Sequence, residues 1–468
     1  MERILSTDTP KHLEAEVTVN GWVHVVRKMG KIIFIEVRDR AGRVQVVFGP
    51  DQVEAYAAAK ELKPEYVVSV TGTVAPRVGK NVRPDHPTGT VELQAHACTI
   101  LARSETPPFE IVETTKQDVN EDVRFKYRYL DLRRQHNRER ILKRSAATKF
   151  IRDFLHREGF VEIETPILAK STPEGARDYL VPSRVYPGRF YALPQSPQQY
   201  KQMLMVAGFE RYFQIAPCFR DEDSRGDRSP DQFYQVDMEL SFTTQDEILD
   251  LTERLFTELI AAVFPEKTVT QSPWPRLTHA EAMEKYGTDK PDLRKNSEDP
   301  NELAFCFIVD WPLFEPEKEN GHYAPAHHMF TAPKTGDIPL LDTDPLEAKS
   351  WQHDVALNGY EVGGGSIRIT DPAIQSKIFD LVGISKADAQ AQFGHMLEAF
   401  RFGVPPHGGI APGLDRLLMI LLNAPNVREV VAFPKTGDNR EIMTGSPSAV
   451  SEEQIRTLHL SAEKPEDT

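Results

Sequence analysis

Hydrophobic and polar residues alternate in five short runs near the N-terminus, which predicts five half-buried β-strands. The runs are Glu16–Val26, Lys31–Asp39, Arg43–Phe48, Tyr66–Val74 and Val91–Leu101. An alanine-rich stretch, Asp51–Leu62, lies between the third and fourth runs and is typical of a helix. Further along, apolar residues recur at helical spacing from Arg138 to Glu158, and Gly159 ends that pattern.

These elements predict two domains joined by a linker. Five strands with a helix between the third and fourth follow the order of an OB-fold barrel, which often holds single-stranded nucleic acid, and we assign it to residues 1–104. A polar linker with consecutive prolines covers residues 105–137. Mixed strands and helices over residues 138–468 predict one large α+β domain, in which the polar residues 295–303 form a short loop.

Composition excludes several classes of protein. The chain has 468 residues, 40% of them apolar and 27% charged, which lies in the globular range. Its densest apolar run, Leu417–Leu422, is too short to cross a membrane, and the N-terminus has no apolar core of a signal peptide. The three cysteines are widely spaced and form no CxxC pair, so we expect a reducing cytoplasm rather than a disulfide framework.

Charge is distributed unevenly along the chain. The net charge is −14, but residues 116–157 carry thirteen basic and six acidic side chains. Residues 1–157 therefore sum to +6 and residues 158–468 to −20. A polyanion such as RNA would be attracted to the first third of the chain, although a solvated basic helix would give the same count.

Three separated segments have the composition of functional motifs. Gly159–Pro166 is a helix stop, a short strand and a proline, whereas Phe219–Glu222 is followed by a charged loop and the predicted strand Tyr234–Phe242. Gly408–Arg416 is a glycine-rich strand that runs into an apolar helix. Each segment alone has an ordinary structural explanation, such as an edge strand, a surface ion pair or a helix cap.

Taken together and in this order, the three segments resemble the motifs of class II aminoacyl-tRNA synthetases, and bacterial aspartyl-tRNA synthetases in particular. Supporting strings lie at residues 128–134, 171–179, 195–202 and 359–368. The resemblance implies a catalytic domain built on an antiparallel sheet, behind an OB-fold anticodon-binding domain. It also implies ligation of L-aspartate to tRNA(Asp) through an aspartyl-adenylate, with ATP as substrate, Mg²⁺ as cofactor and a homodimer formed through the Pro166 region.

The resemblance assigns the ATP site by residue. Arg220 corresponds to the arginine that bridges the aspartate carboxylate and the α-phosphate, a task that suits a planar bidentate fork. Arg416 corresponds to the arginine on the γ-phosphate, and these two are the expected catalytic residues. The other expected ATP contacts are Asp221, Glu222, Ser229, Phe233, Glu361, Gly413, Leu414 and Asp415. Both reaction steps develop charge at phosphate or carbonyl groups, so fixed cations suit the chemistry.

The aspartate pocket must supply positive charge because it receives a second carboxylate. The resemblance gives this role to Lys201 and Arg368, with Asp237 ordering the lysine and receiving the substrate ammonium. The remaining expected contacts are Glu174, Gln198, Arg220 and His327. Asparagine would leave both cations unpaired; at roughly 1.5–3 kcal/mol per charged hydrogen bond, its rejection would be on the order of 10³–10⁴.

Metal and RNA contacts also follow from the resemblance. Asp354 and Glu361, seven positions apart, correspond to carboxylates that hold Mg²⁺ between the phosphates. Phe34 and Gln45 correspond to residues that stack on and read the anticodon bases, and Arg27 to a neighbouring contact.

This sequence departs from the family pattern at several points. Relatives usually carry a domain of over a hundred residues where only Lys295–Leu303 stand here. They often have arginines where Val25 and Val26 stand, and His where Met29 stands in enzymes that also charge tRNA(Asn). Whether tRNA(Asn) is charged is left open, as are two rival functions: a non-catalytic tRNA-binding paralogue and a tRNA-independent aspartate ligase.

Overall fold

The computed structural model describes residues 2–112, 119–172, 175–222, 226, 231–319 and 321–461. It divides into two compact units, residues 1–135 and 136–468. The described helices include none long and apolar enough to cross a membrane.

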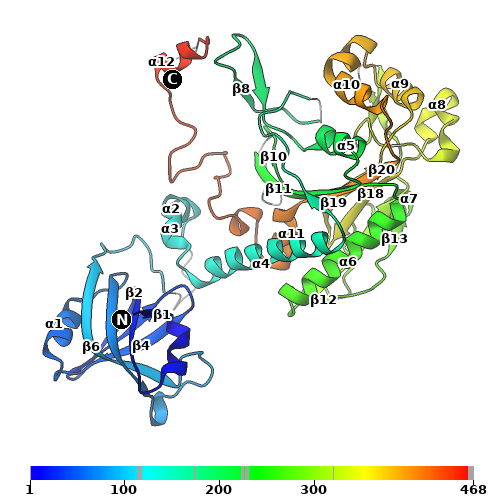
Figure 1. Cartoon of the computed structure of the whole chain (residues 1–468). Coiled ribbons are helices and arrows are strands. Elements are labelled where there is room, and N and C mark those ends of the chain that lie inside the picture. Colours follow the sequence, from blue (N-terminus) through cyan, green and yellow to red (C-terminus); the bar gives the residue numbers. More distant parts are fainter. Residues whose placement is uncertain are drawn as a thin grey trace. The chain divides into compact units, whose positions relative to one another are not determined.

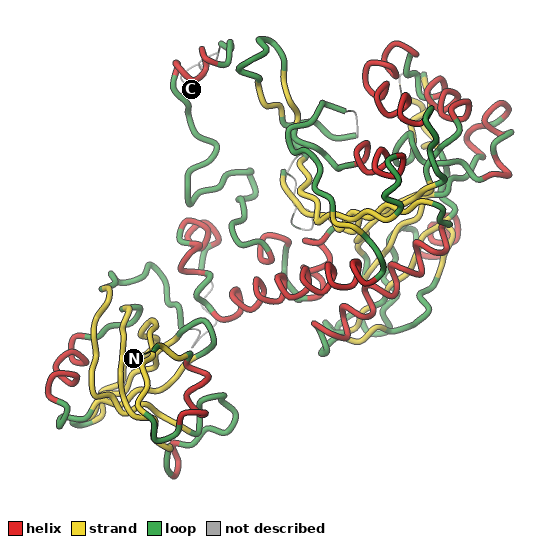
Figure 2. Tube along the Cα trace, in the orientation of Figure 1, coloured by secondary structure: helices red, strands yellow, loops and turns green. Residues whose placement is uncertain are grey.

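The first unit is a closed β-barrel (Figures 1 and 2). Its strands are β1 (Arg3–Ile4), β2 (Glu16–Met29), β3 (Ile32–Arg38), β4 (Arg43–Phe48), β5 (Val67–Pro76) and β6 (Val91–Ala102). They follow the order β1-β2-β3-β4-β6-β5, and a further pairing between β2 and β5 closes the barrel. Helix α1 (Val53–Glu61) lies between β4 and β5, which confirms the OB-fold prediction.

Alternating side chains build the barrel core. Ile33, Ile35 and Val37 of β3 are fully buried, whereas Phe34 and Glu36 between them lie on the outer face. Short elements that the sequence pattern did not predict complete the unit: the 3₁₀ segments η1 (Ser6–His12) and η2 (Gly79–Asn81), and helices α2 (Glu121–Lys126) and α3 (Arg128–Asp131).

The second unit contains a large sheet of eight strands. Their order is β13-β15-β18-β19-β20-β11-β10-β7. The strands are β7 (Val161–Glu162), β10 (Arg211–Phe219), β11 (Gln232–Ser241), β13 (Arg276–Thr278), β15 (Phe305–Val309), β18 (Gln352–Leu357), β19 (Tyr360–Ile367) and β20 (His407–Pro412). All pairings are antiparallel except the two outermost, β7 with β10 and β13 with β15. The predicted antiparallel sheet is therefore correct for its centre and mixed at its edges.

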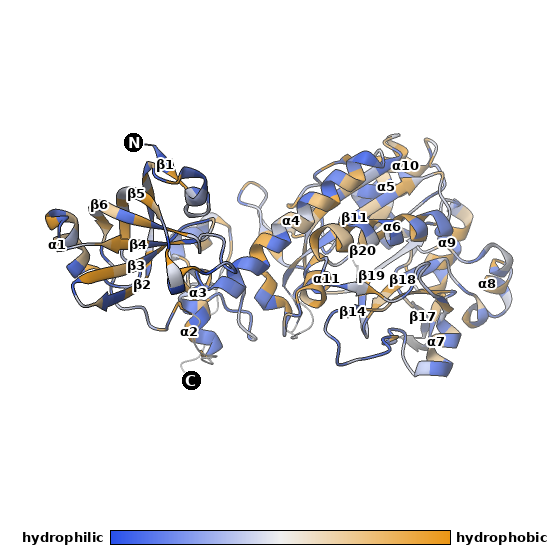
Figure 3. Ribbon diagram, turned by 90° about the horizontal axis from the view of Figure 1, so that it is seen from below, coloured by the Kyte–Doolittle hydropathy of each residue, from blue (hydrophilic) through white to orange (hydrophobic). Residues whose placement is uncertain are grey.

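Helices α4 (Gln135–Arg157), α6 (Gln245–Val263) and α11 (Leu414–Leu421) pack on one face of this sheet. The core between them includes Phe154, Val236, Met238 and Leu255, and Figure 3 colours most of the α11 ribbon as hydrophobic. A Thr244–Glu247 capping box begins α6 and satisfies its first backbone N–H groups. The opposite face of the sheet carries α5 (Gln198–Val206), as Figure 1 shows.

Smaller elements complete the second unit. The helices are α7 (His279–Tyr286), α8 (Leu340–Thr343), α9 (Pro372–Leu381), α10 (Lys386–Phe400) and α12 (Glu452–Thr457), with 3₁₀ segments η3 (Thr335–Asp337), η4 (Pro345–Glu347) and η5 (Val427–Val430). The two-stranded ribbons pair β8 (Leu180–Pro182) with β9 (Phe190–Ala192), β12 (Thr268–Val269) with β14 (Glu302–Leu303), and β16 (Phe314–Glu319) with β17 (His322–Pro325).

The predicted loop at residues 295–303 is closed by its own side chains. Its last two residues form β14, and Leu303 is buried in the main core. The buried Glu302 carboxylate accepts hydrogen bonds from the backbone N–H groups of Lys295 at 2.7 Å and Asn296 at 2.8 Å. A single carboxylate thus ties both ends of the loop together.

We predict that Glu302→Ala destabilises the catalytic unit. The change leaves two backbone donors without their acceptor, which should lower the free energy of unfolding by about 1–3 kcal/mol. Urea unfolding measures the effect. Glu298→Ala in the same loop is the matched control because that side chain is exposed, and equal stability of the two variants would contradict the closing role of Glu302.

Candidate active site

A cavity of about 290 Å³ lies over the face of the large sheet that α4 and α6 leave uncovered. Strands β11, β18, β19 and β20, helix α5 and the loop before Met329 supply its walls. Most of the predicted substrate contacts line it: Gln198, Lys201, Arg220, Phe233, Asp237, His327, Glu361, Arg368, Gly413, Asp415 and Arg416. Residues spread over nearly half of the sequence therefore meet in one place.

Glycine residues lie beneath the functional side chains of this site. A Cβ atom on Gly364 would lie 2.7 Å from Asp354 Oδ1, and one on Gly409 would collide with the Glu239 carboxylate. Because neighbouring strands place functional side chains over these positions, only glycine leaves room for them. The glycine-rich strings of the sequence thus shape the site without contributing side chains to it.

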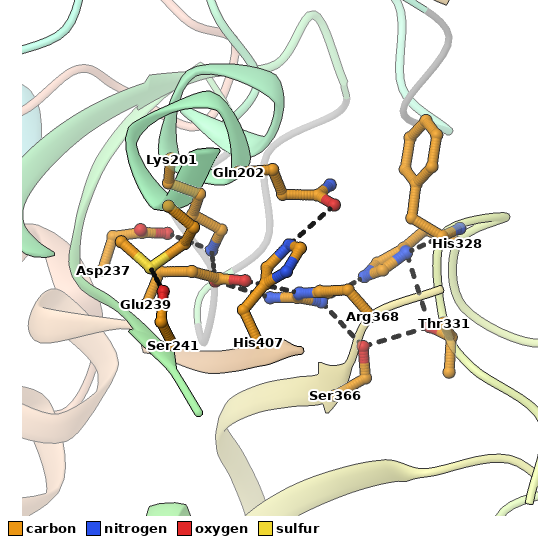
Figure 4. Close-up of polar contacts among 12 residues, drawn as sticks. Lys201, Gln202, Asp237, Glu239, Ser241, His328, Thr331, Ser366, Arg368 and His407 are labelled. Atoms are coloured by element: carbon orange, nitrogen blue, oxygen red, sulfur yellow. Dashed lines mark hydrogen bonds and ion pairs between the residues drawn. The ribbon is translucent and has the colours of Figure 1, made fainter. Parts of the chain in front are cut away.

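Four buried charged residues form a cluster at one end of the cavity (Figure 4). Lys201 Nζ donates to Asp237 Oδ2 at 2.8 Å and lies 3.4 Å from Glu239 Oε2. Arg368 donates through Nε and Nη2 to the two Glu239 oxygens, at 2.9 and 3.0 Å. We call Lys201, Asp237, Glu239 and Arg368 the charge cluster; none of the four is more than 3% exposed.

The charge cluster retains donors for a ligand. Arginine has five N–H groups and lysine three. Besides Glu239, Arg368 contacts Ser366 Oγ at 2.7 Å and His328 Nε2 at 2.8 Å. Counting these contacts, the described residues leave one N–H on Arg368 and one on Lys201 without an acceptor. Two donors on two fixed cations suit a carboxylate.

The surroundings set the protonation of the cluster. Burial alone would raise the pKa of Glu239, but the charges of Arg368 and Lys201 outweigh it and lower this pKa to about 2. Burial, followed by the Arg368 charge, lowers the pKa of His328 well below its ordinary value. His328 is therefore neutral and can accept the Arg368 N–H.

Arg220 also lines the cavity and has one donor unused. Its Nε is buried and has no hydrogen-bond partner among the described residues. Its guanidinium lies 5.0 Å from the centre of the Phe233 ring. A cation held against an aromatic face with a buried N–H free suits an anionic ligand such as a phosphate or carboxylate.

The three residues at the start of α11 that were predicted to contact the nucleotide differ from one another in their surroundings. Asp415 Oδ2 accepts the backbone N–H of Tyr234 at 2.9 Å, and its Oδ1 accepts from Arg144. Leu414 is buried in the core and does not line the cavity. Arg416 Nη1 donates to the Glu361 carbonyl, which holds its side chain over the cavity.

Other predicted residues lie outside the cavity lining. Asp221 and Glu222 follow Arg220 in the chain but do not line the cavity, and Asp221 pairs with Arg177 at 3.7 Å. Glu174 and Ser229 lie outside the described residues.

Asp354 and Glu361 lie on the adjacent strands β18 and β19; Glu361 lines the cavity and Asp354 does not. Asp354 receives His327 Nε2 at 3.4 Å on one oxygen and Gln352 Nε2 at 2.7 Å on the other. Glu361 keeps solvent contact, yet desolvation by the cavity wall and the Asp354 charge raise its pKa. For His327, burial would lower the pKa, but Asp354 outweighs it and raises it.

The donor set of Asp354 and Glu361 fits a hard cation. Two close carboxylates repel each other, as the raised pKa of Glu361 reflects, and a divalent cation would relieve this. No group of three or more metal-ligating side chains occurs within the described part of the chain. Mg²⁺ is typically held by one or two carboxylates together with phosphate oxygens, so this set suits it.

The predicted RNA contacts gather on the outer face of the barrel. Arg27 pairs with Phe34 across β2 and β3, and Glu36 pairs with Gln45 across β3 and β4. Arg27 Nη2 donates to Glu36 at 2.6 Å, and Gln45 Nε2 donates to Glu92 at 2.8 Å. The barrel therefore places an aromatic ring, a cation and an amide side by side.

Glu239 was not predicted as a site residue from the sequence. Its position two residues after Asp237 was the available signal, because residues two apart on a strand share a face. Only the register of β11 beside β20 shows that this carboxylate reaches Arg368.

Comparisons with known proteins agree with this geometry. A family model described as class II tRNA synthetases (D, K and N) matches residues 120–437, and one described as an OB-fold nucleic acid binding domain matches residues 17–101. The aspartate–tRNA(Asp/Asn) ligase of Rubrobacter xylanophilus is 44% identical, over 95% of this chain and 94% of that protein. The aspartate–tRNA ligase of Lysinibacillus sphaericus is 41% identical, over 97% and 98%.

Solved structures share the fold at lower identity. An asparaginyl-tRNA synthetase from Pyrococcus horikoshii superposes with a TM-score of 0.75 at 22% identity, covering 93% of this chain and 98% of that one. An aspartyl-tRNA synthetase from Entamoeba histolytica gives 0.72 at 24% identity, covering 93% and 91%.

An OB-fold barrel followed by this catalytic sheet defines a class II tRNA synthetase, and the chain belongs to that family. Within it, the two full-length relatives above are bacterial aspartate–tRNA ligases. The alignment with the first spans 568 positions, so that relative has at least 100 positions that this 468-residue chain lacks.

We predict that Glu239 makes folding sensitive to acid. Its pKa is about 2 in the folded chain and 4.5 ordinarily, so the unfolded chain binds the proton first. The stabilisation is complete above the ordinary pKa and is lost as the pH falls towards the folded value. Between about pH 6 and pH 4, Glu239→Gln should lose less unfolding free energy than the wild type in urea titrations. Equal losses would contradict this assignment.

Proposed function

We propose that this chain joins L-aspartate to tRNA(Asp) in two ATP-dependent steps. The charge cluster carries the proposal, because Lys201 and Arg368 line the same cavity as Arg220 and each has one N–H without an acceptor among the described residues. A side-chain carboxylate of aspartate would accept both donors. The amide of asparagine would offer its own N–H groups to the same cations and leave them less well satisfied.

Arg220 is the proposed residue for activation. An oxygen of the aspartate α-carboxylate attacks the α-phosphorus of ATP, the bond to the β-phosphate oxygen breaks, and pyrophosphate leaves. Arg220 would contact both the carboxylate and the α-phosphate and would offset the repulsion between these two anions as they approach bonding distance. Phe233 would support the adenine ring, and Arg416 would contact the γ-phosphate.

Several further contacts complete the proposed active site. Asp237 would receive the substrate ammonium, with Gln198, His327 and Glu174 around the amino acid. Asp354 and Glu361 would hold Mg²⁺, which neutralises phosphate charge when it is bound. Proposed nucleotide contacts also include Asp221, Glu222, Ser229 and the chain at Gly413, Leu414 and Asp415.

The transfer step involves the tRNA. A ribose hydroxyl at its 3′ end attacks the carbonyl carbon of the aspartyl-adenylate, and AMP leaves. The outer barrel face with Arg27, Phe34 and Gln45 would bind the anticodon by stacking and hydrogen bonding. One of the two relatives is named for tRNA(Asp) and tRNA(Asn) together, so charging of both remains part of the test.

We further propose a cytoplasmic homodimer. Leu168, Leu180, Val185 and Tyr186 are each more than 50% exposed and lie close in the sequence after β7. Several exposed apolar side chains in one segment are typical of an interface. The cysteines of the chain are all free thiols, which suits a reducing compartment.

Pyrophosphate exchange and aminoacylation test the function directly. The purified chain should exchange pyrophosphate into ATP only with aspartate and should charge purified tRNA(Asp). Exchange without charging of any tRNA would favour a tRNA-independent ligase, and tRNA binding without exchange would favour a non-catalytic paralogue. Charging of tRNA(Asn) in the same assay would show dual specificity.

We predict that Arg220→Ala strongly lowers the rate of aspartate activation. Removing one preorganised donor to developing charge costs about 10²–10³ in rate. Pyrophosphate exchange should fall by this amount, whereas tRNA binding should not change because the barrel is intact. Arg276→Ala, at an exposed ion pair away from the cavity, is the control. Near-normal exchange in the Arg220 variant would refute its role.

We predict that Phe34→Ala weakens tRNA binding and leaves activation unchanged. Loss of one stacking contact costs about 1–3 kcal/mol, which is roughly a 5- to 150-fold higher Kd. Filter binding measures the Kd, and pyrophosphate exchange without tRNA is the internal control. Val53→Ala, at an exposed side chain of α1 in the same unit, is the control variant and should have a smaller effect. Equal tRNA affinity of wild type and Phe34→Ala would exclude stacking.

A further inference from the structure

Gln352 lines the active-site cavity, although the proposed function gives it no role. It lies at the start of β18, two residues before Asp354, and residues two apart on a strand share one face. Its side chain is 3% exposed. A buried amide at the wall of a charged cavity needs partners for both its nitrogen and its oxygen.

The orientation of the Gln352 amide is fixed by its neighbour. Nε2 lies 2.7 Å from Asp354 Oδ1. Because a carboxylate only accepts, the nitrogen must face Asp354 and the oxygen must point away from it. That oxygen is buried and has no hydrogen-bond partner among the residues that the structure describes.

Two side chains, one on each oxygen, hold the Asp354 carboxylate. Gln352 donates to Oδ1, and His327 lies 3.4 Å from Oδ2. The position of Gly364 beneath Asp354 and Gln352 leaves space for both side chains, since a Cβ there would lie 2.7 Å from Asp354 Oδ1 and 3.4 Å from Gln352 Nε2. The carboxylate is thus fixed in place before any ligand binds.

We propose that Gln352 is a positioning residue for a divalent cation at Asp354. Its N–H fixes the carboxylate, and its oxygen accepts a hydrogen bond from the hydration shell of the cation. Mg²⁺ keeps several waters in such sites, so donors of this kind are present when it binds. The inference rests on the proposed function, because Asp354 as a cation ligand belongs to that proposal.

Gln375 provides a matched control within the same chain. It is also 3% exposed, its Nε2 donates to the Met329 carbonyl at 3.0 Å, and its oxygen likewise has no partner in the described residues. It does not line the active-site cavity. Replacing either glutamine with methionine keeps the side-chain volume and removes the amide. The two variants therefore differ only in whether the lost amide lines the active-site cavity.

The experiment titrates Mn²⁺ into the full chain with a non-hydrolysable ATP analogue and follows free Mn²⁺ by electron paramagnetic resonance. Gln352→Met should bind Mn²⁺ about 10- to 100-fold more weakly than the wild type, as for other residues that orient metal ligands. Gln375→Met should match the wild type. Gln352→Asn keeps an amide that is too short to reach Asp354, so it should lose the same affinity, and circular dichroism confirms that each variant is folded.

Equal Mn²⁺ affinity of folded Gln352→Met and wild type would overturn the proposal. It would also be overturned if the wild type with the ATP analogue bound no more Mn²⁺ than the analogue binds alone. Aspartate-dependent pyrophosphate exchange by the wild type tests the proposed function separately. Absent exchange with a weakened Mn²⁺ site in Gln352→Met would refute the function and retain the role of Gln352. Normal exchange by the wild type, with unchanged Mn²⁺ affinity in Gln352→Met, would support the function and refute the role of Gln352.

Discussion

The active site depends on four buried charges that neutralise one another. Lys201 and Arg368 would be costly to bury alone, and the carboxylates of Asp237 and Glu239 offset that cost. The arrangement is neutral as a whole, so the free protein tolerates it, yet each cation keeps one N–H for a ligand. Attraction of a substrate carboxylate then comes from directed donors rather than from excess positive charge.

The rest of the catalytic unit positions this cluster. Antiparallel pairing of β10, β11, β20, β19 and β18 brings distant segments into register, and period-two alternation separates polar from core side chains. In β11, Val236, Met238 and Leu240 pack in the hydrophobic core, whereas Asp237 lines the cavity and Glu239 is buried beside it, bonded to Arg368. Glycine at 364 and 409 leaves room for the functional side chains. A single sheet therefore carries both the hydrophobic core and the charged site.

Much of this was predictable because local signals and long motifs agreed. Alternation in Glu16–Val26 and its neighbours predicted the barrel, and the strings around Lys201, Arg220 and Arg416 predicted which residues share the cavity. The parallel pairing of the edge strands β7 and β13 was not predicted, because pairing at an edge depends on tertiary contacts rather than on pattern.

The roles of individual polar atoms were not predictable from the sequence. The Asp415 carboxylate binds Arg144, 271 positions away, and the Tyr234 backbone, and no motif in the sequence indicated either contact. Glu239 contacts Arg368 across 129 positions, and the proposed role of Gln352 depends on the hydrogen bond between its amide and Asp354. Such contacts depend on strand register and on rotamers, which no short-range pattern encodes.

Binding of the free amino acids tests the central claim most directly. Calorimetric titration of the purified chain with L-aspartate and then L-asparagine, in the presence of a non-hydrolysable ATP analogue, compares a carboxylate with an amide of nearly equal shape. If the N–H groups of Lys201 and Arg368 select the carboxylate, aspartate should bind about 10³-fold or more tightly than asparagine. Comparable affinities for the two amino acids would contradict the account.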